Sequence, residues 1–186
     1  MKIISVVGRK NSGKTTLIER MIPIFRKREM RVAVVKHDAH DFSIDHEGKD
    51  TWRFRQAGAE EVVIASSSQL ALMRRLETPV CPEEILSLLD SPDLVILEGY
   101  KRMHYPKLAV LRCASELTDM HLQDDPTVIG HVLRRLPNAA PPDSKTTQFW
   151  ADEIVRIADF VCSNTMPSPG KIRIRVSGHE WPSAVR

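Results

Sequence analysis

The feature that most constrains the fold of this 186-residue chain is a glycine-rich loop that follows a short apolar run. Residues 8–15 read Gly-Arg-Lys-Asn-Ser-Gly-Lys-Thr, which matches the pattern Gly-x4-Gly-Lys-[Ser/Thr]. Glycines let the backbone curl so that successive N–H groups point at one anion, and a following helix directs its positive end there. In this pattern Lys14 reaches the β- and γ-phosphates, while the Thr15 hydroxyl binds Mg²⁺. The loop therefore predicts a site for a nucleoside triphosphate with Mg²⁺.

The residues on either side of the loop favour an α/β fold. Residues 3–7 form a largely β-branched run that is typical of a buried parallel strand. Residues 15–28 carry apolar side chains at helical spacing, and Pro23 predicts either a kink or a boundary within them. Residues 31–36 are a second strand candidate. Strand, helix and strand thus follow one another over the length of a βαβ unit.

The rest of the pattern predicts a mostly parallel central sheet flanked by helices, with some antiparallel strands. We expect further strands at residues 61–65, 69–76, 93–98, 108–111 and 127–132, and helices at 50–57, 82–89 and 149–161. The first two of these strands flank a polar serine turn and are expected to pair antiparallel. A stretch rich in proline and polar residues predicts a loop at 134–147. We expect one nucleotide-binding domain over residues 1–162 and a tail over 163–186, which holds one charged edge strand at 171–176.

Composition narrows the classes of function. The net charge is +3 and the isoelectric point is near 8.8, which suits anionic ligands without requiring nucleic acid. Aromatic residues make up 5% of the chain and do not interleave with the basic stretches, which argues against nucleic-acid binding. No apolar run approaches the length of a membrane span, and the N-terminal run is too short for the core of a signal peptide. We therefore expect a cytoplasmic protein with no membrane partner.

The cysteines point to no cross-link or metal site. Cys81, Cys113 and Cys162 are far apart and form no Cys-x-x-Cys pair. This spacing argues against a disulfide framework or a zinc site and favours a reducing compartment. We expect each thiol to act as a small buried apolar group.

A phosphate-binding loop needs a carboxylate near its metal, and Glu98 is the candidate. Glu98 ends the predicted strand at 93–98, at the edge where open α/β sheets place their ligands, and Gly99 permits close approach to the γ-phosphate. Asp93 opens the same strand roughly 17 Å away, at about 3.3 Å per residue, so we expect it to be structural. Asp38 follows the second strand at the same edge and could hold a metal-bound water or orient an attacking one.

A polar segment with three histidines follows the second strand. His37, His40 and His46 lie among Asp38, Asp41 and Asp45. A transition-metal site is one interpretation, but the spacings fit no standard ligand pattern and no cysteine joins them. The segment is more typical of a polar, switch-like loop beside the nucleotide. Lys49 and Asp50, before a short helix, could also contact an anion.

Several segments together resemble the molybdopterin-guanine dinucleotide biosynthesis protein B family. The matching blocks come in the family's order and at its spacing over roughly residues 1–112, with weaker likeness to about residue 161. They are Val7-Gly8, Lys10-Asn-Ser-Gly-Lys-Thr-Thr-Leu17, Lys36-His37, His40, Asp45, Gly48-Lys-Asp-Thr51, Gln56-Ala-Gly-Ala59, Asp93-Leu-Val-Ile-Leu-Glu-Gly-Tyr-Lys101 and Pro106-Lys107. Where members of this family often carry His, this chain has Asp38 or Ala39, so its histidine cluster is thinner.

The resemblance implies a P-loop NTPase fold and a GTP-binding accessory protein of molybdenum cofactor biosynthesis. It implies GTP with Mg²⁺ as the ligand, weak hydrolysis at most, a homodimer, and assistance to the guanylyltransferase that joins GMP to molybdopterin, with molybdopterin as a further ligand to consider. The family's phosphate and Mg²⁺ residues correspond to Gly8, Asn11, Ser12, Gly13, Lys14, Thr15 and Thr16, with Glu98 for the metal. A further functional surface corresponds to Lys36, His37, His40, Gly48, Lys49, Asp50 and Lys101. No Asn-Lys-x-Asp guanine reader is present, so the choice of base rests on the resemblance alone.

Two other functions use the same loop. An ATP-dependent small-molecule kinase or synthetase would need an acceptor pocket and a base for the acceptor hydroxyl, for which Asp38 or His37 is a candidate. A non-catalytic module would use nucleotide binding only to switch a surface that docks a partner. Fast, acceptor-dependent turnover distinguishes the kinase or synthetase from the other two. The residues alone do not separate the accessory protein from the binding module.

Overall fold

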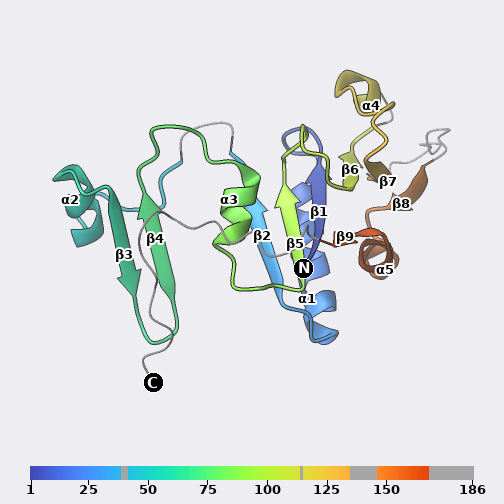
Figure 1. Cartoon of the computed structure of the whole chain (residues 1–186). Coiled ribbons are helices and arrows are strands. Elements are labelled where there is room, and N and C mark those ends of the chain that lie inside the picture. The colour runs from blue at the N-terminus through green and yellow to red at the C-terminus, as the bar shows by residue number, and fades with distance from the viewer. Residues whose placement is uncertain (39–41, 114, 135–145, 168–186) are drawn as a thin grey trace. The chain divides into compact units, whose positions relative to one another are not determined.

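The computed structural model describes residues 1–38, 42–113, 115–134 and 146–167, and the chain falls into two compact units (Figure 1). Unit 1 comprises Met1–His37 and Leu86–Arg186, and unit 2 comprises Asp38–Ile85. The edge strand predicted at 171–176 and most of the loop predicted at 134–147 lie outside the described residues.

Unit 1 is built on a sheet of seven strands, six of them in the order β2-β5-β1-β6-β7-β8. All neighbours along this path pair in parallel, and β9 pairs antiparallel with β1. The strands are β1 (Lys2–Val7), β2 (Val32–Lys36), β5 (Leu94–Glu98), β6 (Lys107–Leu111), β7 (Val128–Leu133), β8 (Thr147–Trp150) and β9 (Met166–Pro167). The predicted, mostly parallel sheet is therefore confirmed.

The central strands are buried on both faces, as their continuous apolar sequences predict. Every residue of β5 and β6 is buried, and so are five of the six residues of β1. The pairing register places Val6 and Lys36 on either side of Glu98. Because these strands are parallel, their carboxyl ends meet at one edge of the sheet, and the loop that follows Val7 starts there.

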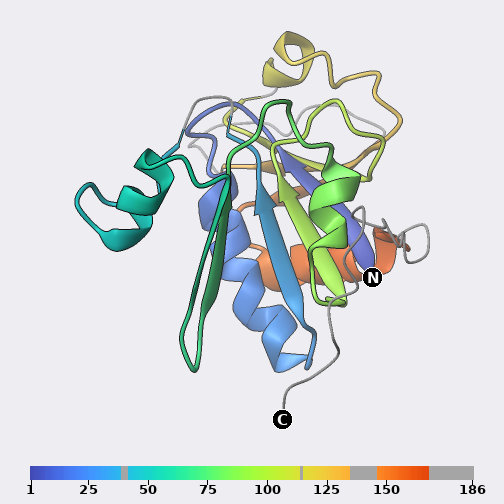
Figure 2. The ribbon, with the colours of Figure 1, turned by 60° about the vertical axis from the view of Figure 1, so that its left-hand side comes forward.

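One face of the sheet is covered by α1 (Lys14–Lys27) and α5 (Ile154–Asn164) (Figure 2). The apolar stripe of α1 consists of Leu17, Ile18, Met21 and Phe25, which all lie in the core. The two helices also pack against each other, and both contribute to one continuous apolar cluster with the inner strands. Pro23 lies inside α1, so it does not mark a helix boundary.

The other face carries a smaller apolar cluster beneath α4 (Glu116–Asp119) and the segment that follows it. Leu117 and Leu122 pack there against Val7, Ala109, Leu111 and Val128. The sequence did not predict α4, because four residues are too few to show helical periodicity. Side chains alternate between the two faces, so Leu108 and Val110 of the same strand belong to the cluster under α1 and α5.

The predicted start of the helix at 149–161 is wrong. Phe149 belongs to β8, pairs with Val132 and is 3% exposed, whereas α5 begins at Ile154. The Glu153 carboxylate accepts a hydrogen bond from the Trp150 backbone N–H at 2.7 Å, which stabilises the turn between strand and helix. A four-residue strand has too short an alternation to be separated from the helical pattern that follows it.

The prediction that all cysteines are buried is also wrong. Cys81 and Cys113 are exposed, and Cys162 is half-buried. All three are free thiols, as the spacing predicted. None of the helices among the described residues is long and apolar enough to cross a membrane.

Unit 2 contains α2 (Asp50–Gln56) and the antiparallel pair β3 (Glu61–Ala65) and β4 (Leu70–Arg74). Gly58 adopts a φ of 104° just after α2, a left-handed conformation that ends helices and favours glycine. The predicted helix and antiparallel pair are thus confirmed. The remaining short helix, α3 (Pro82–Ser87), spans the boundary between the two units.

The packing of α5 predicts that two alanine substitutions on this helix change the free energy of unfolding by very different amounts. Ile157 is 0% exposed in the core, so Ile157→Ala should lower the free energy of unfolding by about 2–5 kcal/mol. Val155 is 61% exposed on the same helix, so Val155→Ala should change it by less than about 0.5 kcal/mol. Urea denaturation followed by circular dichroism measures both. Equal effects would contradict the packing of α5 described here.

Candidate functional site

The glycine-rich loop forms a tight curl between β1 and α1. Asn11 has a φ of 62° and Gly13 a φ of 99°, so two residues of the loop lie in the left-handed region. The Ser12 N–H donates to the Arg9 carbonyl at 3.2 Å, and the Lys14 ammonium donates to the same carbonyl at 2.7 Å. The lysine side chain therefore folds back over the loop.

Gly8 is required by a close approach between the loop and β6. A Cβ added at Gly8 would lie 2.4 Å from the Val110 carbonyl oxygen and 2.5 Å from the Ser12 Oγ. The first contact is with backbone, which cannot rotate away as a side chain can. The invariant glycine of the motif thus has a steric reason here, since any side chain would push the loop off the sheet.

The Ser12 hydroxyl is buried and has no hydrogen-bond partner among the described residues. Buried hydroxyls in proteins are nearly always hydrogen-bonded, and one without a partner calls for an explanation. Its place within the loop, next to Gly13 and Lys14, suits a donor to a phosphate oxygen.

Thr15 and Glu98 meet where α1 begins and β5 ends. The Thr15 hydroxyl donates to Glu98 Oε1 at 3.1 Å, and Glu98 is only 8% exposed. A hydroxyl and a carboxylate are oxygen donors of the kind that Mg²⁺ prefers. The residue types and their contact therefore fit a Mg²⁺ site of the P-loop kind.

Lys14 at the loop has two further lysines, Lys36 and Lys101, close enough to act on its charge. The pKa of Lys14 is lowered, chiefly by burial and further by the positive charges of Lys101 and Lys36, while Glu98 and Glu116 oppose the shift. Lys36 and Lys101 form no ion pair among the described residues. Clustered ammonium groups of this kind repel one another, and an anionic ligand relieves that repulsion.

A sharp turn after Glu98 brings Lys101 back to the site. Gly99 and Tyr100 have φ values of 101° and 38°, both left-handed, so the chain reverses at once. The His37 N–H donates to the Glu98 carbonyl at 3.0 Å, and its ring lies 5.2 Å from that of Tyr100. Burial raises the pKa of the Tyr100 hydroxyl. The His37 and Tyr100 rings thus brace the turn that carries Lys101.

The structure brings most predicted site residues together at the carboxyl edge of the sheet in unit 1. These are Gly8, Asn11, Ser12, Gly13, Lys14, Thr15, Thr16, Lys36, His37, Glu98 and Lys101. Asp93 lies at the opposite end of β5, where its carboxylate accepts from the Arg31 N–H at 2.7 Å, which confirms its structural role.

The other predicted residues belong to unit 2 or lie outside the described residues. Asp38, Gly48, Lys49 and Asp50 are in unit 2, and their roles stay predictions, while His40 is not among the described residues. Within unit 2, the Asp45 carboxylate accepts a hydrogen bond from the Thr51 hydroxyl at 2.9 Å. Within the described residues, no group of three or more His, Cys, Asp or Glu could hold a metal ion.

Two acidic residues of α4, Glu116 and Asp119, act on the loop and were not predicted from the sequence. Glu116 is 2% exposed, pairs with Arg112 and acts on the charge of Lys14. Asp119 forms an exposed ion pair with Arg9 at 2.8 Å. Neither carries a sequence signal, because α4 is too short to be predicted and lies about a hundred residues from the loop.

The chain resembles proteins of molybdopterin guanine dinucleotide synthesis. Residues 3–133 match the family model described as molybdopterin guanine dinucleotide synthesis protein B. The chain is 34% identical over 161 residues to a molybdopterin-guanine dinucleotide biosynthesis adapter protein of Haemophilus influenzae, covering 86% of each chain. It is 29% identical over 165 residues to the Escherichia coli adapter protein, covering 86% of this chain and 90% of that one.

Solved structures of the same kind share the fold. A crystal structure of molybdopterin-guanine biosynthesis protein B is 34% identical, with a TM-score of 0.66 over 87% of this chain and 98% of the other. A crystal structure of the Bacillus subtilis protein MobB is 27% identical, with a TM-score of 0.73 over 89% of this chain and 99% of the other. The P-loop type of fold is therefore confirmed.

The lysine cluster predicts how the charge of Lys14 responds to its neighbours. In protein labelled with ¹³C at lysine Cε, Lys14 should titrate below the ordinary pKa of 10.5. Lys101→Met removes a repelling charge and should raise this pKa, whereas Glu98→Gln removes an attracting one and should lower it further. Lys27→Met, at the far end of α1, is the matched control and should leave it unchanged. No response to Lys101→Met would contradict the cluster.

Proposed function

The chain belongs to the molybdopterin guanine dinucleotide synthesis protein B family, and from that premise we propose that it binds GTP with Mg²⁺ as an accessory protein of molybdenum cofactor biosynthesis. It would assist the guanylyltransferase that joins GMP to molybdopterin. The observation that carries this proposal is the meeting of the curled loop, three lysines and the Thr15–Glu98 pair at one edge of the sheet.

The loop would hold the triphosphate mainly through charge and backbone N–H groups. Lys14 already lies over the loop, and a bound phosphate would exchange its contact with the Arg9 carbonyl for a charge-assisted one. The Ser12 hydroxyl would gain a partner that it lacks within the described residues. Lys36 and Lys101 would balance the remaining negative charge at the open side of the site.

Thr15 and Glu98 would hold the metal. Their oxygens are in contact at 3.1 Å, so Mg²⁺ would replace the hydrogen bond between them. When bound, Mg²⁺ would supply positive charge that neutralises the phosphates. Glu98 is buried at the end of β5, and the backbone bonds from His37 and Gly99 fix this position.

Weak hydrolysis fits the groups around the loop. Efficient P-loop GTPases use a residue that orients water and an arginine that stabilises the transition state. Arg9, the arginine within the loop, is held by Asp119, and the loop sequence itself contains no glutamine. Asp38 follows β2 in the sequence and is the candidate for orienting water. We therefore propose an adapter whose nucleotide governs docking more than turnover, in the cytoplasm and as a homodimer.

Calorimetry with GTP and ATP tests the nucleotide and the loop together. Lys14→Ala removes a charge-assisted phosphate contact, so it should weaken Mg²⁺–GTP binding by about 10- to 150-fold, or about 1.5–3 kcal/mol. Lys27→Ala is the matched control, since it also removes a lysine of α1, at the end far from the loop. GTP should bind more tightly than ATP. Tighter binding of ATP would favour a small-molecule kinase or synthetase, and no binding of either would refute the proposal.

A second variant separates the metal from the phosphate contacts. Glu98→Gln removes a carboxylate ligand, so it should weaken GTP binding in Mg²⁺ by about tenfold or more. In EDTA the same variant should bind GTP as well as the unmodified protein or better, because a buried negative charge has gone. Glu19→Gln, on the exposed side of α1, is the control. If Glu98→Gln weakens binding equally with and without Mg²⁺, Glu98 is not the metal ligand.

A further inference from the structure

An ion pair ties the glycine-rich loop to α4. The Arg9 guanidinium lies 2.8 Å from the Asp119 carboxylate and joins the second residue of the loop to the last residue of α4. The two side chains are 43% and 48% exposed, so water reaches both partners. Besides Lys14, the loop thus carries a guanidinium that a carboxylate of the same unit binds.

The backbone of Arg9 lies next to the Lys14 ammonium. The Arg9 carbonyl accepts from Lys14 Nζ at 2.7 Å and from the Ser12 N–H at 3.2 Å. A carbonyl oxygen lies about 2.4 Å from its own Cα, so the Arg9 Cα is within about 5 Å of the ammonium. An extended arginine side chain is longer than this distance. The guanidinium can therefore reach an oxygen atom of an anion that Lys14 binds.

The helix that carries Asp119 is held in place independently of the loop. The Glu116 carboxylate is 2% exposed and accepts from the Arg112 backbone N–H at 2.9 Å and from the Arg112 guanidinium. Leu117 and the nearby Leu122 are 7% and 3% exposed in the apolar cluster on this face of the sheet. These contacts do not involve the ion pair, so α4 keeps its position when the pair breaks.

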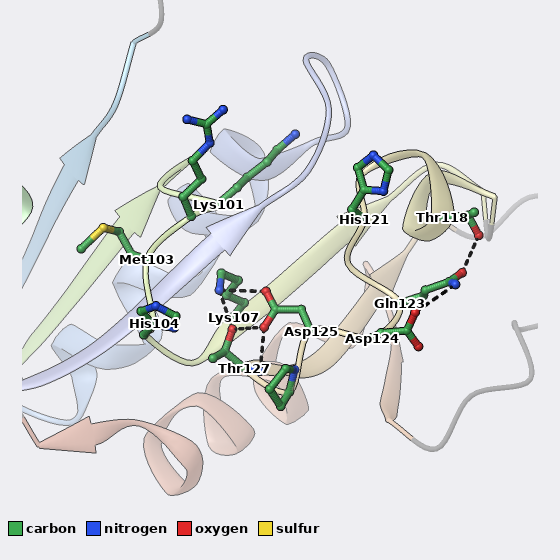
Figure 3. A pocket seen from close by; sticks show the side chains of 12 residues that line it. Lys101, Met103, His104, Lys107, Thr118, His121, Gln123, Asp124, Asp125 and Thr127 are labelled. Atoms are coloured by element: carbon green, nitrogen blue, oxygen red, sulfur yellow. Dashed lines mark hydrogen bonds and ion pairs between the residues drawn. The ribbon is translucent and has the colours of Figure 1, made fainter.

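The segment that follows α4 is also fixed, as the close view in Figure 3 shows. The Thr118 hydroxyl donates to the Gln123 carbonyl at 2.8 Å, and the Gln123 amide donates to Asp124 at 3.2 Å. Nearer the sheet, the buried Lys107 ammonium donates to Asp125 at 3.0 Å. The last carboxylate of α4 is thus presented from a fixed backbone, and a change of partner requires movement of the arginine side chain alone.

Typical strengths of the two kinds of contact decide which partner the guanidinium prefers. An exposed ion pair favours the paired state by about 1.4- to 5-fold. A charge-assisted hydrogen bond to a phosphate is worth about 10- to 150-fold, and the guanidinium fork suits phosphate oxygens. A phosphate within reach would therefore take the guanidinium from Asp119, and the carboxylate would offset only part of the gain.

We propose that Arg9 is a further phosphate-binding residue of the loop and that Asp119 competes with the phosphates for it. This inference rests on the proposed function, in which the loop binds a nucleoside triphosphate. Binding moves the guanidinium from Asp119 to a phosphate oxygen, while Lys14 exchanges the Arg9 carbonyl for the same anion. The Asp119 carboxylate then loses its cation, so the exposed end of α4 is more negative in the bound protein than in the free protein.

A double-mutant cycle on the full chain tests the competition, with Mg²⁺–GTP affinity measured by calorimetry. Arg9→Gln should weaken binding at least about threefold, because a phosphate contact is lost. Asp119→Asn should tighten binding when Arg9 is present, because the competing carboxylate is gone. The gain should exceed the effect of Asp119→Asn in the Arg9→Gln background by about two- to fivefold, which is the strength of the broken pair.

The same cycle separates competition from a simple effect of charge. Removing a negative charge near an anion site tightens binding by itself, and that effect does not need Arg9. Equal tightening by Asp119→Asn in both backgrounds would therefore overturn the proposal, and so would an Arg9→Gln variant with unchanged affinity. Asp119→Glu keeps the carboxylate and should bind GTP as the unmodified protein does.

Controls come from exposed positions on α1. Glu19→Gln and Arg26→Gln make the same changes of charge on that helix and should leave GTP affinity unchanged. Arg9 and Asp119 are themselves exposed, so thermal melting should show folded protein for each variant.

Inorganic tripolyphosphate distinguishes failure of this proposal from failure of the proposed function. It offers the loop the same phosphate oxygens without a nucleoside. If the protein binds neither GTP nor ATP, the proposed function fails, and the cycle repeated with tripolyphosphate still decides the role of Arg9. If tripolyphosphate does not bind either, both proposals are overturned.

Discussion

The contact between the Thr15 hydroxyl and the Glu98 carboxylate joins the start of α1 to the end of β5, and the candidate site is arranged around it. It forms because β1 and β5 are parallel neighbours whose carboxyl ends are in register, Val6 opposite Glu98. The loop between β1 and α1 curls over the same edge and passes close to β6. A side chain at Gly8 would collide there with the Val110 carbonyl. Sheet register and one glycine together place a hydroxyl, a carboxylate and the loop at one edge of the sheet.

Charge is concentrated at this edge without being fully neutralised. Burial and the neighbouring Lys36 and Lys101 make the protonated form of Lys14 less favourable. Glu98 and Glu116 offset part of this effect, because their negative charges favour the protonated form. Such a balance suits a ligand that brings negative charge with it, because binding then removes the repulsion among the lysines.

Much of the fold followed from local patterns, and the exceptions have physical reasons. Long, buried runs such as β1 and β5 were predicted because both faces are apolar, and α1 because its apolar stripe has helical spacing. β8 and α4 were missed because four residues carry too little periodicity, and Phe149 reads as helical until its pairing with Val132 is known. The cysteines were expected inside, but a thiol's burial depends on the elements around it, and two of the three are exposed.

The sequence by itself determined the glycine-rich loop, its lysine and threonine, and the carboxylate at the end of a strand, because each depends on residue types at short spacing or at a strand end. Only the tertiary structure decided which distant residues join them. Lys36 and Lys101 reach the loop through parallel pairing and a left-handed turn, and Glu116 through a helix about a hundred residues away.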